Sequence, residues 1–162
     1  MIIVAWAMLI IFYDIRSRTI PNYLSIGALL LALLVLSVTG QTVTHEPMYS
    51  AIFGLIIALL ITIPAYAFKL LGGGDVKLLC GISLLCGVNV MITSFVIASL
   101  SLFVILIILS RLYLLNIILP LDIKPLVQRA PKEKYIPFGA VIAVGLVLTQ
   151  VYPNIFRLPY PI

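Results

Sequence analysis

The chain has 162 residues, of which 64% are hydrophobic and 9% are charged, and its mean hydropathy is +1.29. A soluble domain carries about 25% charged residues, so these proportions exclude a water-soluble globular fold and make the bilayer the solvent. The net charge is +5, but no dense stripe of Lys and Arg with interleaved aromatic residues is present, which argues against nucleic-acid binding.

Hydrophobic segments follow one another along the whole chain. They run over about 1–15, 23–38, 48–68, 75–88, 90–113 and 137–152. No basic residue precedes the first segment, so we expect it to be retained as a span and not cleaved as a signal peptide. A span needs about 20 apolar residues, so the first and fourth are short, which local bilayer thinning tolerates. We predict an all-α, polytopic membrane helix bundle with about six transmembrane helices, in one domain covering 1–162.

The basic residues alternate between the connections. Nine of the ten fall on one side of the membrane if all six segments cross: Arg16, Arg18, Lys69, Lys77, Arg111, Lys124, Arg129, Lys132 and Lys134. Positive charge marks the cytoplasmic side, so both termini should lie outside the cytoplasm. The proline-rich stretch 114–135 carries mixed charges, and we expect it to be a cytoplasmic interfacial loop.

The chain contains five acidic residues, and two of them adjoin hydrophobic segments: Asp14 and Asp75. The other three fall in connections, where charge is ordinary. Ionisable groups beside membrane spans are rare and often functional. Each aspartate alone has an ordinary alternative role, as a helix cap or an interfacial ion pair. Together, on one side of a bundle, they could converge on one water molecule.

The local sequences predict how each aspartate is held. Asp14 precedes Ile20-Pro21-Asn22, where the proline should end a helix and Asn22 can cap the next one. Asp75 follows three glycines, which allow unusual or closely approached backbone and should place it at a helix start. Two neighbouring carboxyl groups share a proton, so one can act as a general base while the other polarises a carbonyl group.

Other catalytic groups are not indicated. The single histidine, His45, lies in the connection on the opposite side beside Glu46, where we expect it to be solvated. No serine-hydrolase or zinc-protease motif occurs. Cys80 and Cys86 are not spaced as a Cys-x-x-Cys site and are too far apart along one helix for a disulfide. We therefore expect no metal and no cofactor.

Three motifs in order resemble those of the type IV prepilin peptidases, a family of intramembrane aspartyl proteases. They are Asp14-x-Arg16 with Ile20-Pro21-Asn22, Gly72-x-Gly74-Asp75-Val76-Lys77, and Ile136-Pro137-Phe138-Gly139. The resemblance implies that Asp14 and Asp75 are the catalytic pair. It also implies a substrate, a prepilin or pseudopilin-like precursor whose short basic leader is removed at the cytoplasmic face of the inner (plasma) membrane.

The chain departs from longer family members in one respect. Those carry an N-terminal region with paired Cys-x-x-Cys motifs, associated with N-methylation of the product, and this chain lacks it. It is therefore more similar to the short peptidases, and methyltransferase activity is not implied. Presenilin-like proteases also pair Tyr-Asp with Gly-x-Gly-Asp, but their Pro-Ala-Leu motif is absent here.

Supporting roles are predicted around the two aspartates and at the start of the last segment: Gly72, Gly73, Gly74, Arg16, Lys77, Pro21, Asn22, Pro137 and Gly139. The glycines should let a substrate backbone approach. Lys77 either tunes Asp75 or only snorkels to the membrane surface, and Arg16 either orients Asp14 or only anchors its helix. Pro137 and Gly139 either line the cleft or only begin a helix.

Functions of other classes stay open. A small transporter or proton-conducting subunit could also use buried aspartates beside a glycine break, although no transporter-like repeat is visible. A non-catalytic scaffold of a pilus or secretion system could keep both aspartates for structure alone. The lipid bilayer is a certain partner under every alternative, and the oligomeric state is left open.

Overall fold

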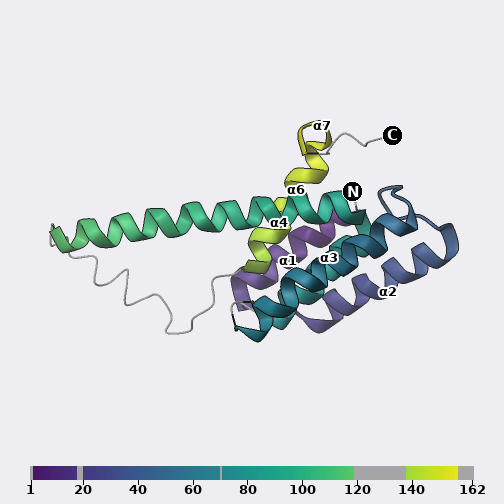
Figure 1. The fold of residues 1–162 in the computed structure, drawn as a ribbon, viewed down its shortest axis with the longest axis horizontal. Helices are drawn as coiled ribbons and strands as arrows, with labels where there is room; N and C mark the ends of the chain where they lie inside the picture. Colours follow the sequence, from purple (N-terminus) through teal and green to yellow (C-terminus); the bar gives the residue numbers. More distant parts are fainter. Residues whose placement is uncertain (1, 18–19, 70, 119–137, 157–162) are drawn as a thin grey trace.

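The computed structural model describes residues 2–17, 20–69, 71–118 and 138–156. Their helices, coloured along the chain in Figure 1, are α1 (Ile2–Ser17), α2 (Asn22–Thr39), α3 (Met48–Ala67), α4 (Gly73–Ile118), α6 (Phe138–Val151) and α7 (Pro153–Phe156). The described residues form no strand beyond one isolated bridge between Gln41 and Pro47. The predicted all-α helix bundle is confirmed.

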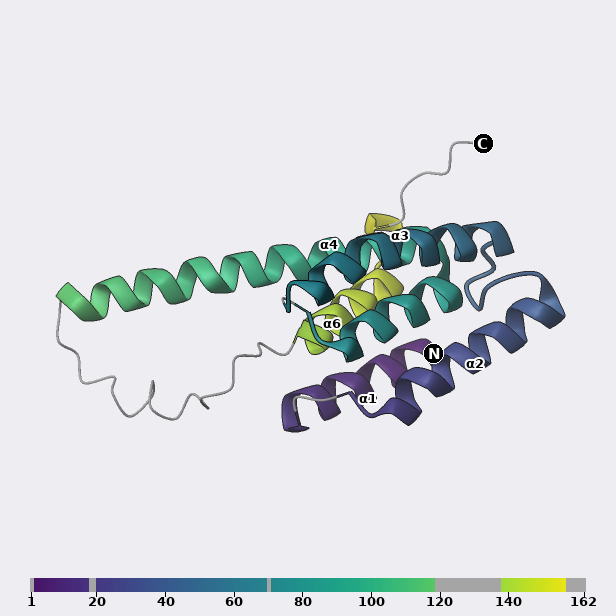
Figure 2. The ribbon, with the colours of Figure 1, turned by 60° about the horizontal axis from the view of Figure 1, so that its bottom comes forward.

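Helix α4 is bent back on itself at Gly87. The backbone there has φ 83° and ψ 177°, which is outside helical geometry and is accessible almost only to glycine. Figures 1 and 2 show that the chain reverses its direction here, so both arms, 73–86 and 88–118, extend from the bend toward the same end of the molecule. The two arms correspond to the fourth and fifth predicted segments, and residues 78–87 are buried at the centre of the bundle.

The connection between α2 and α3 holds this bend. The Val43 N–H donates to the Leu85 carbonyl oxygen (2.9 Å), and the Thr44 hydroxyl donates to the Cys86 carbonyl oxygen (2.9 Å). On the far side of the bend, the Val88 N–H donates to Ser50 Oγ (3.2 Å). Backbone groups at the two helix ends beside the bend have no partner within a helix, and these hydrogen bonds supply one inside the protein.

Glu46 corrects one expectation from the sequence. Its side chain is not an ordinary loop charge, because only 5% of the residue is exposed, and Ser50 Oγ donates to its Oε2 at 3.0 Å. The connection 40–47 folds inward over the Gly87 bend, which takes Glu46 with it. His45, its neighbour, is exposed as expected.

Small residues fill the contacts between the helices, and large apolar residues face outward. Ala32, Ala51 and Ala58 are almost fully buried, whereas Leu34 is 64% and Leu60 is 68% exposed. This inversion is what a helix bundle in lipid requires, because close packing and not exclusion of water joins the helices. The described outer surface is therefore suited to hydrocarbon.

Three stretches are long and apolar enough to cross a membrane, namely Asn22–Thr39, Met48–Ala67 and Gly73–Ile108. The third contains the bend, and α1 and α6 are shorter. These stretches indicate a membrane protein, and the six crossings stay a prediction.

The second arm of α4 corrects the boundary expected for the loop at 114–135. It continues as helix to Ile118, because residues 114–118 are apolar except for Asn116 and simply extend the preceding turns. Residues 119–135 of that loop lie outside the described part of the chain.

Candidate active site

Three helix ends meet at one end of the bundle. They are the C-terminal end of α1, which carries Asp14, the start of α4, which carries Asp75, and the start of α6 (Figure 2). Each belongs to a different one of the three sequence motifs. The fold thus brings together residues that are more than one hundred positions apart in the chain.

Asp14 is buried in this junction, with 5% of the residue exposed. Its Oδ2 accepts a hydrogen bond of 2.6 Å from the backbone N–H of Ala140. Ala140 lies in the first turn of α6, where backbone N–H groups have no partner within the helix. The start of α6 therefore provides both a donor and the positive end of a helix dipole beside this carboxyl group.

Asp75 lies in the first turn of α4 and is half-buried, so the expected helix start is confirmed. Its Oδ2 accepts the N–H of Gly72 at 3.1 Å, and its own N–H donates to the Gly72 carbonyl oxygen at 3.1 Å. The carboxyl group therefore caps its own helix. None of the three glycines before it has a positive φ, so their contribution is space and not unusual backbone.

Gly139 lies between the two carboxyl groups. A Cβ placed on it would lie 3.0 Å from Asp75 Oδ1 and 3.1 Å from Asp14 Oδ2. Both oxygens therefore approach residue 139 closely, because it has no side chain to hold them apart. Asp14 also acts electrostatically on Asp75.

Ile20 packs into the same junction from the connection between α1 and α2. A Cβ on Gly139 would meet its Cδ1 at 2.7 Å, and a Cβ on Gly74 would meet its Cβ at 3.5 Å. Ile20 thus joins all three motifs. Ile20 belongs to the first motif, but the sequence indicated no role for it. The sequence also did not indicate Ala140, because Ala140 contributes through its backbone N–H, which no residue pattern reveals.

Asn22 differs from its expected role as a helix cap, and Lys77 has a partner that the sequence did not indicate. The Lys77 ammonium group donates to Asn22 Oδ1 at 2.9 Å. Asn22 is the first residue of α2, whose N-cap position is Pro21, and no side chain caps that helix. The amide of Asn22 is engaged by the lysine, so it ties the start of α2 to the start of α4.

The remaining supporting residues are less closely involved. Arg16 is exposed and forms no ion pair with any residue that the structure describes. Pro137, like Arg18, lies outside the described residues. Cys80 and Cys86 are buried and form no disulfide with each other, and in the described ranges no cluster of His, Cys, Asp or Glu could hold a metal ion.

A comparison with known protein families gives a match over the part of the chain that holds the first two motifs. A sequence model of the type IV leader peptidase family matches residues 1–109, a stretch that contains both aspartates and ends before the third motif. Neither a curated protein nor a solved structure matches the chain. The match covers more than half of the chain, which therefore belongs to the type IV leader peptidase family, a family of membrane proteases.

Proposed function

We propose that this protein is an intramembrane aspartyl endopeptidase, with Asp14 and Asp75 as its catalytic pair. The observation that carries the proposal is the convergence of the two carboxyl groups at Gly139, where Asp75 Oδ1 and Asp14 Oδ2 lie 3.0 Å and 3.1 Å from the position of the absent Cβ. The burial of Asp14 adds support, because a carboxyl group is seldom placed among apolar helices without a task.

The mechanism follows from the two carboxyl groups. The ionised carboxylate removes a proton from the water held between them, and the water oxygen attacks the scissile carbonyl carbon. The protonated carboxyl group donates its proton to the carbonyl oxygen. When the tetrahedral intermediate collapses, the C–N bond breaks and the carboxyl group that took a proton from water gives it to the leaving nitrogen. One hydroxyl group of the intermediate returns its proton to the other carboxylate, so the pair again shares one proton.

The substrate in this proposal is a type IV prepilin or pseudopilin-like precursor, and cleavage removes its short basic leader. Six segments cross the inner membrane, with the arms of α4 as the fourth and fifth. The charge pattern supports an aspartate end on the cytoplasmic side, because Arg16, Lys69 and Lys77 all lie around it. The family match supports the leader-peptidase reading in general form.

The test is cleavage of a co-expressed precursor by the parent protein, by Asp14→Asn and by Asp75→Asn, at equal membrane levels. Asparagine keeps the shape of the side chain but cannot exchange the proton, so each variant should lose cleavage by about a thousandfold or more. Glu46→Gln is the matched control, since it neutralises a buried carboxyl group at the opposite end of the bundle.

The outcomes separate the competing functions. If both aspartate variants cut as well as the parent, the pair is structural and the transporter or scaffold alternatives replace the peptidase. If Glu46→Gln abolishes cleavage at normal membrane levels, the loss of any buried carboxyl group is enough to stop cleavage. The result for the two aspartates would then not support a catalytic role.

A further inference from the structure

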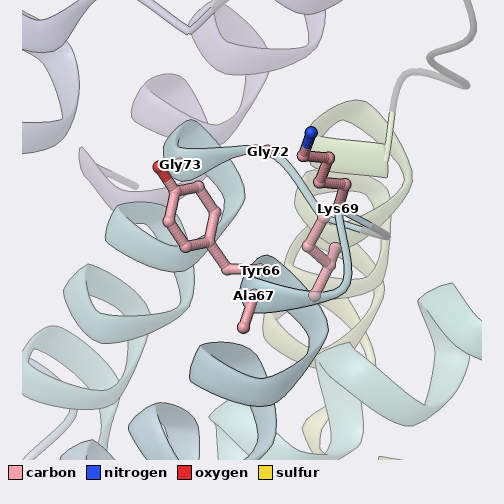
Figure 3. A pocket seen from close by; sticks show the side chains of 6 residues that line it. Tyr66, Ala67, Lys69, Gly72 and Gly73 are labelled. Atoms are coloured by element: carbon pink, nitrogen blue, oxygen red, sulfur yellow. The ribbon is translucent and has the colours of Figure 1, made fainter.

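The start of α4, which carries Asp75, has a space on its α3 side. A pocket of about 530 Å³ lies there, lined by residues from the end of α3 and the chain leading into α4: Tyr66, Ala67, Lys69, Leu71, Gly72 and Gly73 (Figure 3). This space reduces the packing between the two helices near Asp75. Contacts with other elements are therefore needed to fix the position of its carboxyl group.

The segment that leads into α2 supplies two such contacts. A Cβ on Gly74 would meet Ile20 Cβ at 3.5 Å, and the Lys77 ammonium group donates to Asn22 Oδ1 at 2.9 Å. Gly74 and Lys77 are three positions apart on α4, so they lie on the same face of the helix. The start of α4 is thus attached to this segment at two neighbouring points.

Lys77 does not face Asp75. Residues two positions apart on a helix point to nearly opposite sides, and the ammonium group of Lys77 is engaged by Asn22. The geometry therefore favours a role for Lys77 through Asn22 over a direct effect of its charge on Asp75.

The hydrogen bond between Lys77 and Asn22 also links the two parts of the bundle that carry the carboxyl groups. Helix α1, with Asp14, packs against α6, whereas α2 packs against α4, with Asp75. Asn22 follows Asp14 after a short stretch of chain, and Lys77 follows Asp75 within one helical turn. A shift of the start of α4 relative to α2 would therefore change the separation of the two carboxyl groups.

We propose that Lys77 and Asn22 are positioning residues. Their hydrogen bond, together with the contact between Ile20 and Gly74, keeps the start of α4 at the separation from α1 that cleavage requires. Neither side chain needs to touch the substrate. The proposal rests on the peptidase function proposed above.

The first experiment is a double-mutant cycle on precursor cleavage. Lys77→Met and Asn22→Leu each remove one partner of the hydrogen bond, and each should lower kcat by about tenfold, the scale of one hydrogen bond to a charged group. KM should change little, because the groups that bind the precursor remain. The double variant should be no slower than either single variant, since the second change removes nothing more. Asn22→Asp keeps an acceptor and should retain most of the activity that Asn22→Leu loses.

Arg111→Met is the matched control for the lost positive charge. It removes an exposed cation from the second arm of α4 and should cut as well as the parent. If Asn22→Leu also cuts as well as the parent while Lys77→Met does not, Lys77 acts through its charge, and the positioning role is wrong.

The second experiment measures the position of α4 without using activity. Ile20→Cys and Gly74→Cys are combined in one chain, because their Cβ atoms would lie 3.5 Å apart, within the range of about 3.5–4.5 Å that a disulfide needs. Gly74 has no positive φ, so its backbone accepts a cysteine. Disulfide formation is followed by counting free thiols after denaturation. Adding Lys77→Met or Asn22→Leu should slow it severalfold, and adding Arg111→Met should not.

The two experiments separate this inference from the function on which it rests. Equal rates of disulfide formation with and without the hydrogen bond would show that it does not hold the start of α4, and the positioning role would be wrong even if the parent cuts. If the parent cuts no precursor, the peptidase function fails, and the role of Lys77 and Asn22 in cleavage fails with it. Slower disulfide formation would then show a structural attachment alone.

Discussion

The missing side chain of Gly139 is as important to the candidate site as the two carboxyl groups it separates. Three side-chain atoms from three helix ends or connections approach the position of its absent Cβ: Ile20 Cδ1 at 2.7 Å, Asp75 Oδ1 at 3.0 Å and Asp14 Oδ2 at 3.1 Å. The Ile20 contact is under 3.0 Å and would force a shift, and the two carboxyl oxygens would have to give by a few tenths of an ångström, so any larger residue would disturb the carboxyl pair.

Gly139→Ala should therefore lower kcat for precursor cleavage by about a hundredfold, since small displacements of catalytic groups have effects of this size. Gly27→Ala is the matched control, because a Cβ there meets nothing within 4 Å, and it should cut normally. Adding Ile20→Val, which removes Cδ1, should restore part of the activity. Equal cleavage rates for Gly139→Ala and the parent would mean that cleavage does not depend on the close approach of the two carboxyl groups at residue 139.

The bent helix α4 is the element that puts Asp75 in reach of Asp14. The first arm carries Asp75 from the centre of the bundle to the junction, and its other end is fixed at Gly87, where Ser50 and Glu46 leave no room for a side chain. A Cβ on Gly87 would meet Ser50 Oγ at 2.9 Å and Glu46 Cγ at 3.0 Å. Backbone conformation and packing both require glycine at this one position.

Gly87→Ala should destabilise the fold by about 2 kcal/mol or more, combining the cost of positive φ for a residue with a Cβ with the steric contacts. Gly81→Ala, in the same arm, should be tolerated, because its Cβ would meet only Trp6 at 3.8 Å. Thermal unfolding of the two purified variants in the same detergent measures the difference. A Gly87→Ala protein as stable as Gly81→Ala would contradict the role given to the bend.

The two arms of α4 differ greatly in length, and the candidate site lies at the end of the shorter one. At about 1.5 Å per residue, the first arm of α4 is about 21 Å long, against a hydrocarbon core of about 30 Å. The second arm continues past the end of the bundle (Figure 1), and Leu100, Phe103 and Ile108 on it are exposed. The aspartates are therefore recessed with respect to the end of that arm, and under the proposed six crossings we expect the bilayer to thin there or to admit water to them.

The orientation of the whole molecule can be tested by labelling single cysteines with a membrane-impermeant maleimide on intact cells. His45→Cys, beyond the end of α2, should be labelled directly. Arg16→Cys, at the aspartate end, should be labelled only after the cells are permeabilised. Both positions are exposed, and the natural cysteines are buried and should give little background. Labelling of both positions from the same side would refute the topology.

The sequence alone determined the class of protein and its two principal residues. Composition required a membrane protein, because so few charged residues cannot cover a water-exposed surface. Apolar run lengths and the positions of proline and glycine predicted the helices to within a few residues, including both arms of α4. Asp14 and Asp75 could be identified because acidic residues beside apolar segments are rare.

Tertiary structure alone decided how those residues are arranged. Several contacts join parts of the chain separated by up to 126 positions. They are the hydrogen bond from Ala140 to Asp14, the contacts around Gly139 and the hydrogen bond from Lys77 to Asn22. Local sequence carries no record of such contacts, because a backbone amide or an absent side chain looks the same in any helix. The sequence named the chemical groups, and the packing of helix ends against one another placed them at a common point.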